Sequence, residues 1–162
     1  MGPREIQAPM IKETRWSFKQ ILNEDFQQCR NLVISGGWGY SPEDAIILEP
    51  TPDMVPTEYL IVEKRLYEEL IIYRAEGDQY AGIEWKLQKQ ALKMIDGRHY
   101  DYLVFDVTAF HDSDWDYLSR DWVMNNGYLD NPEGKAKHDA ERQKRQVHFV
   151  AEYWFDISKK FS

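Results

Sequence analysis

The sequence predicts an α+β fold, a single domain in which a mainly antiparallel sheet packs against helices. Residues 100–110 and 147–157 alternate apolar and polar side chains, which is typical of strands with one buried face. Residues 58–74 instead carry apolar side chains at the spacing of a helix. The chain has 162 residues, 43% of them hydrophobic, and no long linker, so one core over residues 1–162 is expected.

The N-terminal part begins with a segment that lacks any periodicity. Residues 1–10 hold two prolines and a glycine, and we expect a loose N-terminal arm. Between about residues 14 and 30, Leu22, Phe26 and Cys29 follow helical spacing and predict a helix. Residues 31–35 place aliphatic side chains just before a pair of glycines, which indicates a short buried strand that runs into a turn.

Two segments have both a helical and a strand interpretation. Ser41 and Pro42 are typical of a helix start, whereas residues 45–48 are rich in β-branched side chains and are soon followed by three prolines. In residues 83–94, apolar side chains recur every three or four positions, yet the first of them also alternate. The patterns leave helix and strand open for residues 45–48 and 83–94.

The remaining elements follow from stronger patterns. Thr57 is a suitable N-cap for the helix predicted over residues 58–74. The period of two in residues 147–157 places Phe149, Tyr153 and Phe155 on one buried face, in the same sheet as residues 100–110. Between these strands, Ser113 is expected to cap a helix that ends near residues 125–127. The charged run from 135 to 145 fits a solvated helix or loop.

Charge and composition restrict the class of partner. The formal net charge is −8, from 28 acidic and 20 basic residues, and such a surface repels nucleic acid and anionic lipid. A basic protein partner is therefore favoured. The single cysteine, Cys29, allows no internal disulfide, and apolar runs are only a few residues long. We expect a cytoplasmic protein with no membrane span and no signal peptide.

One pattern is typical of metal-dependent nucleases. In restriction-endonuclease-like enzymes, an aspartate and a Glu-x-Lys on adjacent strands hold a divalent metal, and the lysine helps to activate water. Here Asp53 follows a proline, and Glu84 and Lys86 form the Glu-x-Lys. If residues 82–88 form a strand, Glu84 and Lys86 share one face. Asp53 falls in a proline-rich loop and the net charge opposes DNA, so a nuclease or related hydrolase is the alternative function.

No other motif predicts a metal or a cofactor. Asp112, Asp114 and Asp116 resemble the start of a calcium loop, but its sixth and twelfth positions hold Tyr117 and Val123 in place of glycine and an acid. The glycines at 36, 37 and 39 match no phosphate-binding fingerprint. Zinc spacing is absent among the four histidines, which are His99, His111, His138 and His148.

Three aromatic stretches resemble parts of a small bacterial family without established chemistry: residues 36–40, 96–101 and 153–156. By size, acidity and tryptophan content, the chain is similar to immunity proteins that are encoded beside bacterial polymorphic toxins. That resemblance transfers no individual residue. It implies a non-enzymatic inhibitor whose acidic, aromatic surface blocks a basic toxin domain.

Two groups of residues are candidates for such a surface. Trp38 and Tyr40 lie in a glycine-rich turn, where they either pack in the core or, because loops often carry recognition, are presented to a partner. The second group combines three acids, which would steer a basic partner, with a tryptophan that could supply contact area. It consists of Asp112, Asp114, Trp115 and Asp116. Trp115 is also in phase with Leu118. The pattern is therefore equally compatible with a Trp115 side chain in the core and with acidic residues that only cap the helix.

Overall fold

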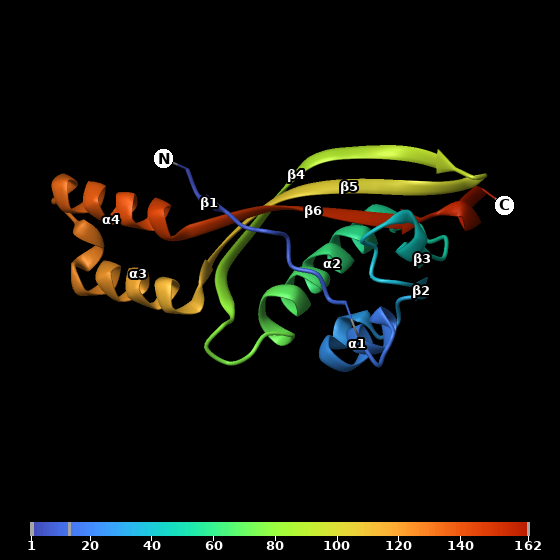
Figure 1. The fold of residues 1–162 in the computed structure, drawn as a ribbon, viewed down its shortest axis with the longest axis horizontal. Helices are drawn as coiled ribbons and strands as arrows, with labels where there is room; N and C mark the ends of the chain where they lie inside the picture. Colours follow the sequence, from blue (N-terminus) through green and yellow to red (C-terminus); the bar gives the residue numbers. More distant parts are fainter. Residues whose placement is uncertain (1, 13, 162) are drawn as a thin grey trace.

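The fold is described by a computed structural model that covers residues 2–12 and 14–161. These residues form four α-helices and a six-strand, mostly antiparallel sheet, which confirms the predicted α+β class (Figure 1). The strands are β1 (Arg4–Glu5), β2 (Ile34–Gly36), β3 (Ile46–Leu48), β4 (Tyr80–Ile95), β5 (Arg98–His111) and β6 (Gln146–Asp156). The helices are α1 (Phe18–Asp25), α2 (Met54–Tyr67), α3 (Asp112–Met124) and α4 (Pro132–Arg145).

The two segments with the clearest alternation form the centre of the sheet. The strand order is β2-β3-β6-β5-β4, and β1 pairs separately with the beginning of β6. The pairs β4–β5 and β5–β6 are antiparallel, whereas β3 and β1 run parallel to β6. Strands β5 and β6 are neighbours, so the prediction that residues 100–110 and 147–157 belong to one sheet is confirmed.

The core lies between one face of this sheet and the helices α1 and α2. Phe149, Tyr153 and Phe155 are all buried in it, as the period of two predicts. Ser17 and Gln20 form a capping box that fixes the start of α1. The helices contribute Phe18, Ile21, Leu22, Ile61, Val62 and Leu66 to the core. The other face of the sheet is not part of this core.

A β-bulge explains why residues 83–94 have two interpretations. They belong to β4, whose register against β5 shifts between Leu87 and Lys89. The shift moves the alternation by one position, so Leu87 and Met94 lie on the same face although they are seven residues apart. That spacing imitates a helix. Asp96 and Gly97, both with positive φ, make the tight turn that pairs β4 with β5.

Several predicted boundaries change. Residues 41–48 contain a short form of both predicted elements. A 3-10 turn, η2 (Pro42–Asp44), stands where the helix start is predicted, and the strand β3 follows it. Helix α2 begins at Met54, before the predicted cap Thr57, and continues into a π-helix, η3 (Glu68–Ile72). The π-helix changes the direction of the side chains that follow Tyr67, including that of Glu69.

Helices α3 and α4, with the turn η4 (Asn126–Tyr128) between them, extend beyond the sheet along the longest axis of the molecule (Figure 1). We call residues 112–145 the helical projection. His111, and not Ser113, is the N-cap of α3, because its ring nitrogen accepts a hydrogen bond from the Ser113 backbone N–H. The charged run from 135 to 145 is helical and belongs to α4.

The N-terminal segment differs from the loose arm that its composition predicts. Arg4 and Glu5 pair in parallel with β6, and the Ile6 N–H donates to the carbonyl oxygen of His148 at 3.0 Å. Farther along, Ile6 and Ile11 pack against the core. The segment therefore lies along the free part of the β6 edge, which sequence patterns alone do not reveal.

Candidate functional site

The helical projection carries an unusual number of exposed apolar side chains. Val123 is 76% exposed and Met124 is 83% exposed, at the end of α3 that lies farthest from the sheet. Together with three further exposed residues of α3 and the segment after it, which lie on more than one side of the helix, they make up what we call the projection surface. Its members are Tyr117, Trp122, Val123, Met124 and Leu129. Clusters of large exposed apolar groups are typical of surfaces that bind other molecules.

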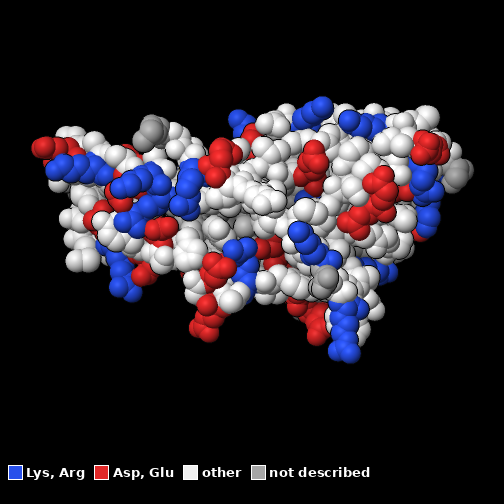
Figure 2. All heavy atoms as spheres, in the orientation of Figure 1, with Lys and Arg blue, Asp and Glu red and all other residues white. Residues whose placement is uncertain are grey.

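The projection surface belongs to a part of the chain that carries both acidic and basic residues. Between residues 112 and 130 the chain has five aspartates and a single basic residue, Arg120. Helix α4 is richer in lysine and arginine, and Figure 2 shows these basic side chains gathered over α4, with uncharged atoms at the end of the projection beneath them. The apolar surface is therefore flanked by negative charge on α3 and by mixed charge on α4.

A polar network holds the two helices of the projection together. The Oδ2 atom of Asp121 accepts the hydroxyl of Tyr128 at 2.7 Å and lies 2.8 Å from Nδ1 of His138. These hydrogen bonds lower the pKa of Asp121 and raise the pKa of Tyr128 to about 12. The ring of Trp122 packs against both Tyr128 and His138. Contacts between α3, η4 and α4 thus hold the end of the projection together.

The four candidate residues at the start of α3 have different surroundings. Asp112 is exposed, and so is Asp116, which forms an ion pair with Arg120 within the same helix. Asp114 forms an ion pair with Arg145 of α4, with 2.6 Å between Oδ1 and Nη1. Trp115 is half-buried. Its ring packs on Phe110 of β5 and over Gly82 of β4, where it attaches the projection to the sheet.

Trp38 is not an exposed anchor. It is only 7% exposed, and its ring stacks on Phe18 of α1 with 4.3 Å between the centroids. The surrounding glycines are required by the turn itself, because the Asp44 carboxylate accepts the backbone N–H groups of Trp38 and Tyr40 and a Cβ on Gly37 would overlap it. Figure 1 places this turn and α3 toward opposite ends of the longest axis. The two predicted groups therefore do not form one surface.

Tyr40 instead belongs to a buried polar cluster. Its hydroxyl donates to Oε2 of Glu69 at 2.6 Å, and Oε2 also lies 3.4 Å from Nε of Arg65. The guanidinium of Arg65 is sandwiched between the rings of Tyr40 and Tyr153, and it donates to the carbonyl oxygens of Trp38 and Glu152. Arg65 therefore connects α2 to the β2–β3 turn and to the edge of β6.

Sequence reasoning missed this Arg65 cluster, although a signal exists. Arg65 and Glu69 are spaced i,i+4 and interrupt the apolar stripe formed by Leu66 and Leu70, where charged residues are unexpected. Burial raises the pKa of Glu69, and the charge of Arg65 opposes that shift. The π-helix over residues 68–72 places Glu69 here, and π-helices are frequent at functional sites.

Two other glutamates are buried as well, Glu58 in α2 and Glu68 in η3. Burial raises the pKa of Glu58 to about 9, and a hydrogen bond with Asp101 acts in the same direction. Burial likewise raises the pKa of Glu68 to about 9, with support from Asp25. Both oxygens of Glu68 and one of Glu58 have no hydrogen-bond partner among the described residues. These shifts favour the protonated form of both carboxyl groups at neutral pH.

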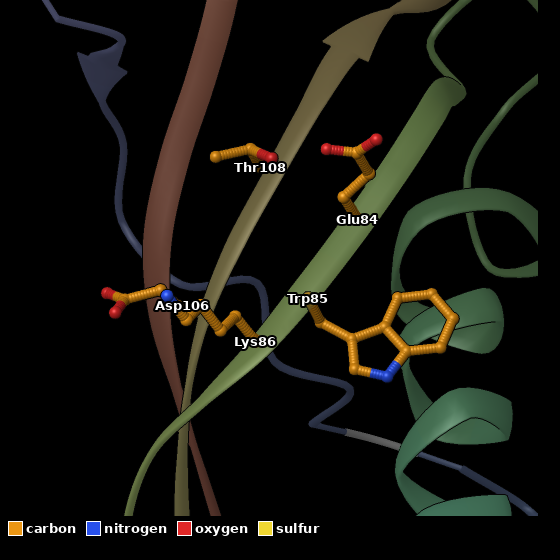
Figure 3. Close-up of a pocket in the computed structure, with 5 residues that line it drawn as sticks. All are labelled: Glu84, Trp85, Lys86, Asp106 and Thr108. Atoms are coloured by element: carbon orange, nitrogen blue, oxygen red, sulfur yellow. The ribbon is translucent and has the colours of Figure 1, made fainter.

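The Glu-x-Lys pattern lies on the open face of the sheet. Figure 3 shows Glu84 and Lys86 of β4 with Asp106 and Thr108 of β5 around a shallow hollow of about 560 Å³, while Trp85 turns toward the helices. Lys86 and Asp106 are direct partners in the β4–β5 register. An acid that the sequence pattern did not include therefore lies beside the lysine.

Asp53 does not join this group. It precedes α2, and its two neighbours in the chain line a hollow together with Lys160, which follows β6. Glu84 lies at the other end of the sheet, because it pairs with Thr108 of β5, which in turn pairs with His148 of β6. The eight steps from His148 to Asp156 span roughly 26 Å at about 3.3 Å each. The predicted trio of Asp53, Glu84 and Lys86 is not assembled, because Asp53 lies at the start of α2 near the opposite end of the sheet.

His148 links the open face to the N-terminal segment. Its Nδ1 lies 2.7 Å from a carboxylate oxygen of Glu5 and its Nε2 lies 2.9 Å from Oδ1 of Asp106. The hydrogen bond with Glu5, supported by Asp106, raises the pKa of His148. The imidazolium form therefore bridges β1 and β5.

Within residues 2–12 and 14–161, no three His, Cys, Asp or Glu side chains are arranged to hold a metal ion. No helix in the described part of the chain is long and apolar enough to cross a membrane. Comparisons with protein-family models, curated proteins and solved structures found no significant match.

Proposed function

We propose that this chain is a non-enzymatic binding protein, of the kind represented by immunity-type inhibitors, that docks a basic protein partner through the projection surface. The observation that carries the proposal is the exposure of Val123, Met124 and Leu129 at the end of a helical projection that is braced by contacts of its own. An inhibitor of this kind needs only to cover its target, so binding alone accounts for the function.

Each part of the projection has a physical role in such a complex. The exposed apolar side chains supply area that is removed from water on binding, and Tyr117 and Trp122 are of the residue types that dominate binding energy. Asp112 and Asp116 supply negative charge that accelerates encounter with a basic surface. The Asp121 network and the ion pair of Asp114 with Arg145 brace the helices, which lowers the entropy lost on binding.

The test measures binding to the basic product of a neighbouring gene, with Val123→Glu and Met124→Glu combined in one variant. We expect the dissociation constant to rise by at least about tenfold, because charge replaces buried apolar contact. Val33→Glu is the matched control, since Val33 is 59% exposed but lies outside the projection. Equal affinity for wild type and the double variant, with both folded, would remove the projection surface from the interface.

A second candidate is a metal-dependent hydrolase in which Asp106 takes the place of Asp53. The observation in its favour is that Asp106, Glu84 and Lys86 line the same hollow (Figure 3). The test is cleavage of single- and double-stranded DNA in the presence of Mg²⁺ or Mn²⁺, with Lys86→Ala as the inactive control. Cleavage that Lys86→Ala retains, or no cleavage by the wild type, contradicts this candidate.

A further inference from the structure

A hollow of about 340 Å³ is lined by both helices of the projection. Helix α3 supplies the indole rings of Trp115 and Trp122 and the buried side chain of Leu118. Helix α4 supplies His138 and Arg142, which are one turn apart and therefore lie on the same face of that helix. Aromatic and apolar walls that hold a few polar groups are typical of sites for small molecules.

One ring nitrogen of His138 points toward this hollow without a partner. The His138 side chain is only 6% exposed, and its Nδ1 lies 2.8 Å from Oδ2 of Asp121. His138 lines the hollow but Asp121 does not, so Nδ1 faces away from the hollow and Nε2, across the ring, faces toward it.

A ligand can reach this nitrogen. Nε2 of His138 has no hydrogen-bond partner among the described residues, yet it is not one of the partnerless atoms that are cut off from solvent. A side chain that is almost wholly buried thus presents its one unpaired polar atom at the surface of the hollow. Such an atom is satisfied by a group that enters the hollow.

The contact with Asp121 prepares Nε2 for an anionic ligand. Hydrogen bonds from His138 and Tyr128 lower the pKa of Asp121, so its carboxylate is ionised and orients the imidazole ring through Nδ1. When an anion binds at Nε2, the negative charge of Asp121 compensates the proton that this nitrogen then carries.

Arg142 adds a positive charge that no acid balances. Its guanidinium lies over the ring of Phe110 at 5.0 Å, and it forms no ion pair with any of the residues that the structure describes. Two other cations of α4 differ in this respect, since Arg145 and Lys135 are both paired with carboxylates. Arg142 is half-buried, and a guanidinium in such surroundings favours a carboxylate as its partner.

We propose that this hollow binds a small aromatic carboxylate. The ring of the ligand lies against the indoles of Trp115 and Trp122, and its carboxylate accepts hydrogen bonds from Arg142 and from Nε2 of His138. This site goes beyond the proposed protein binding and does not rest on it, because its polar groups lie on α4, outside the projection surface.

The volume limits the size of the ligand. At about 30 Å³ per water-sized group, the hollow of about 340 Å³ holds at most roughly eleven such groups. A benzene ring that is joined to a carboxylate by two methylene groups, 3-phenylpropanoate, has about that number of heavy atoms. Its amide, 3-phenylpropanamide, has the same shape without the charge, so the pair isolates the contribution of the carboxylate.

The test titrates 3-phenylpropanoate into the ¹⁵N-labelled protein and follows the indole N–H signals. We expect saturable shifts for Trp115 and Trp122 with a dissociation constant of about 0.1–10 mM, and none for Trp16, which is exposed outside the projection. The amide should bind at least about tenfold more weakly. Shifts that do not saturate, or equal affinity for the two compounds, would overturn the proposal. Tighter binding of a tripeptide with a C-terminal phenylalanine would identify a chain terminus as the ligand instead.

Two matched variants locate the carboxylate. Arg142→Gln removes the charge from the hollow and should weaken 3-phenylpropanoate at least about tenfold while leaving the affinity for the amide unchanged. Arg120→Gln removes the same charge from an exposed position of α3 that does not line the hollow, and should leave both affinities unchanged. Full affinity for the carboxylate in a folded Arg142→Gln variant would contradict the assignment. The comparison of carboxylate and amide on the wild-type protein depends on neither variant.

Discussion

Arg65 and Glu69 form an ion pair from which water is excluded: Nε and Oε2 are 3.4 Å apart, and each side chain is 1% exposed. The guanidinium also binds two backbone carbonyls, one from the β2–β3 turn and one from β6. A buried pair of this kind contributes modestly as a unit, but removal of one partner leaves an uncompensated charge or unsatisfied polar groups. The pair therefore makes the packing of α2 on the sheet specific.

The first prediction concerns that pair. Arg65→Met should lower the free energy of unfolding by about 3–5 kcal/mol, because Glu69 and two carbonyl groups lose their partner. Urea denaturation at neutral pH measures the change. The double variant with Glu69→Leu should recover part of the loss, since it removes both charges. A double variant that is less stable than Arg65→Met alone would show that the uncompensated carboxylate is not the cause.

The second prediction concerns the pH dependence of stability. Burial raises the pKa of Glu68 to about 9, so the folded protein keeps a proton that the unfolded chain releases above pH 4.5. Stability from this group is fully present below about pH 4.5 and is lost as pH rises toward 9, at up to about 1.4 kcal/mol per pH unit. Glu58 acts in the same direction.

Glu68→Gln tests this linkage, because glutamine keeps the size of the side chain and cannot ionise. Thermal unfolding of wild type and variant should be compared between pH 5 and 9. We expect the variant to lose less stability than wild type as the pH rises. Parallel curves for the two proteins would mean that Glu68 ionises equally in the folded and unfolded states.

The third prediction concerns the joint between the projection and the sheet. A Cβ on Gly82 would stand 2.6 Å from the Trp115 ring, and Gly82 has a φ of +57°. Gly82→Ala should therefore destabilise the fold by about 1–3 kcal/mol through overlap and backbone strain. Gly77→Ala is the matched control, because Gly77 also has positive φ but open space around it. The difference between the two variants measures the overlap with Trp115, and equal losses would exclude it.

The fourth prediction concerns His148 and the N-terminal segment. The hydrogen bonds with Glu5 and Asp106 raise the pKa of His148 above 6.5, so their stabilisation is complete below pH 6.5 and is lost as pH rises through the folded-state pKa. NMR titration of the imidazole should give a value above 6.5, and Glu5→Gln should lower it. Proteolysis of the N-terminal segment should become faster at high pH. An unchanged titration in Glu5→Gln would rule out the bridge.

The sequence alone determined the centre of the sheet, because the alternation of β5 and β6 is a local pattern that depends on one buried face. It also determined the acidity of α3, with Asp112, Asp114 and Asp116 among the aspartates. The sequence could not show whether Asp53, Glu84 and Lys86 form a metal site, because it does not give the distances between them in space. The pattern located the Glu-x-Lys on a strand face but could not supply its neighbour Asp106.

Tertiary structure decided the features that depend on residues distant in the chain. The β-bulge at Leu87 becomes visible only in the register with β5, so the apolar spacing of β4 looked helical. Trp38 is buried because Phe18 of α1 covers it, a contact between segments with no shared pattern. Arg65 and Glu69 enter the interior because Tyr40, Tyr153 and two carbonyl groups from other elements compensate their desolvation. Local periodicity records which face of an element is apolar, but which polar group is buried depends on partners that only the folded chain brings together.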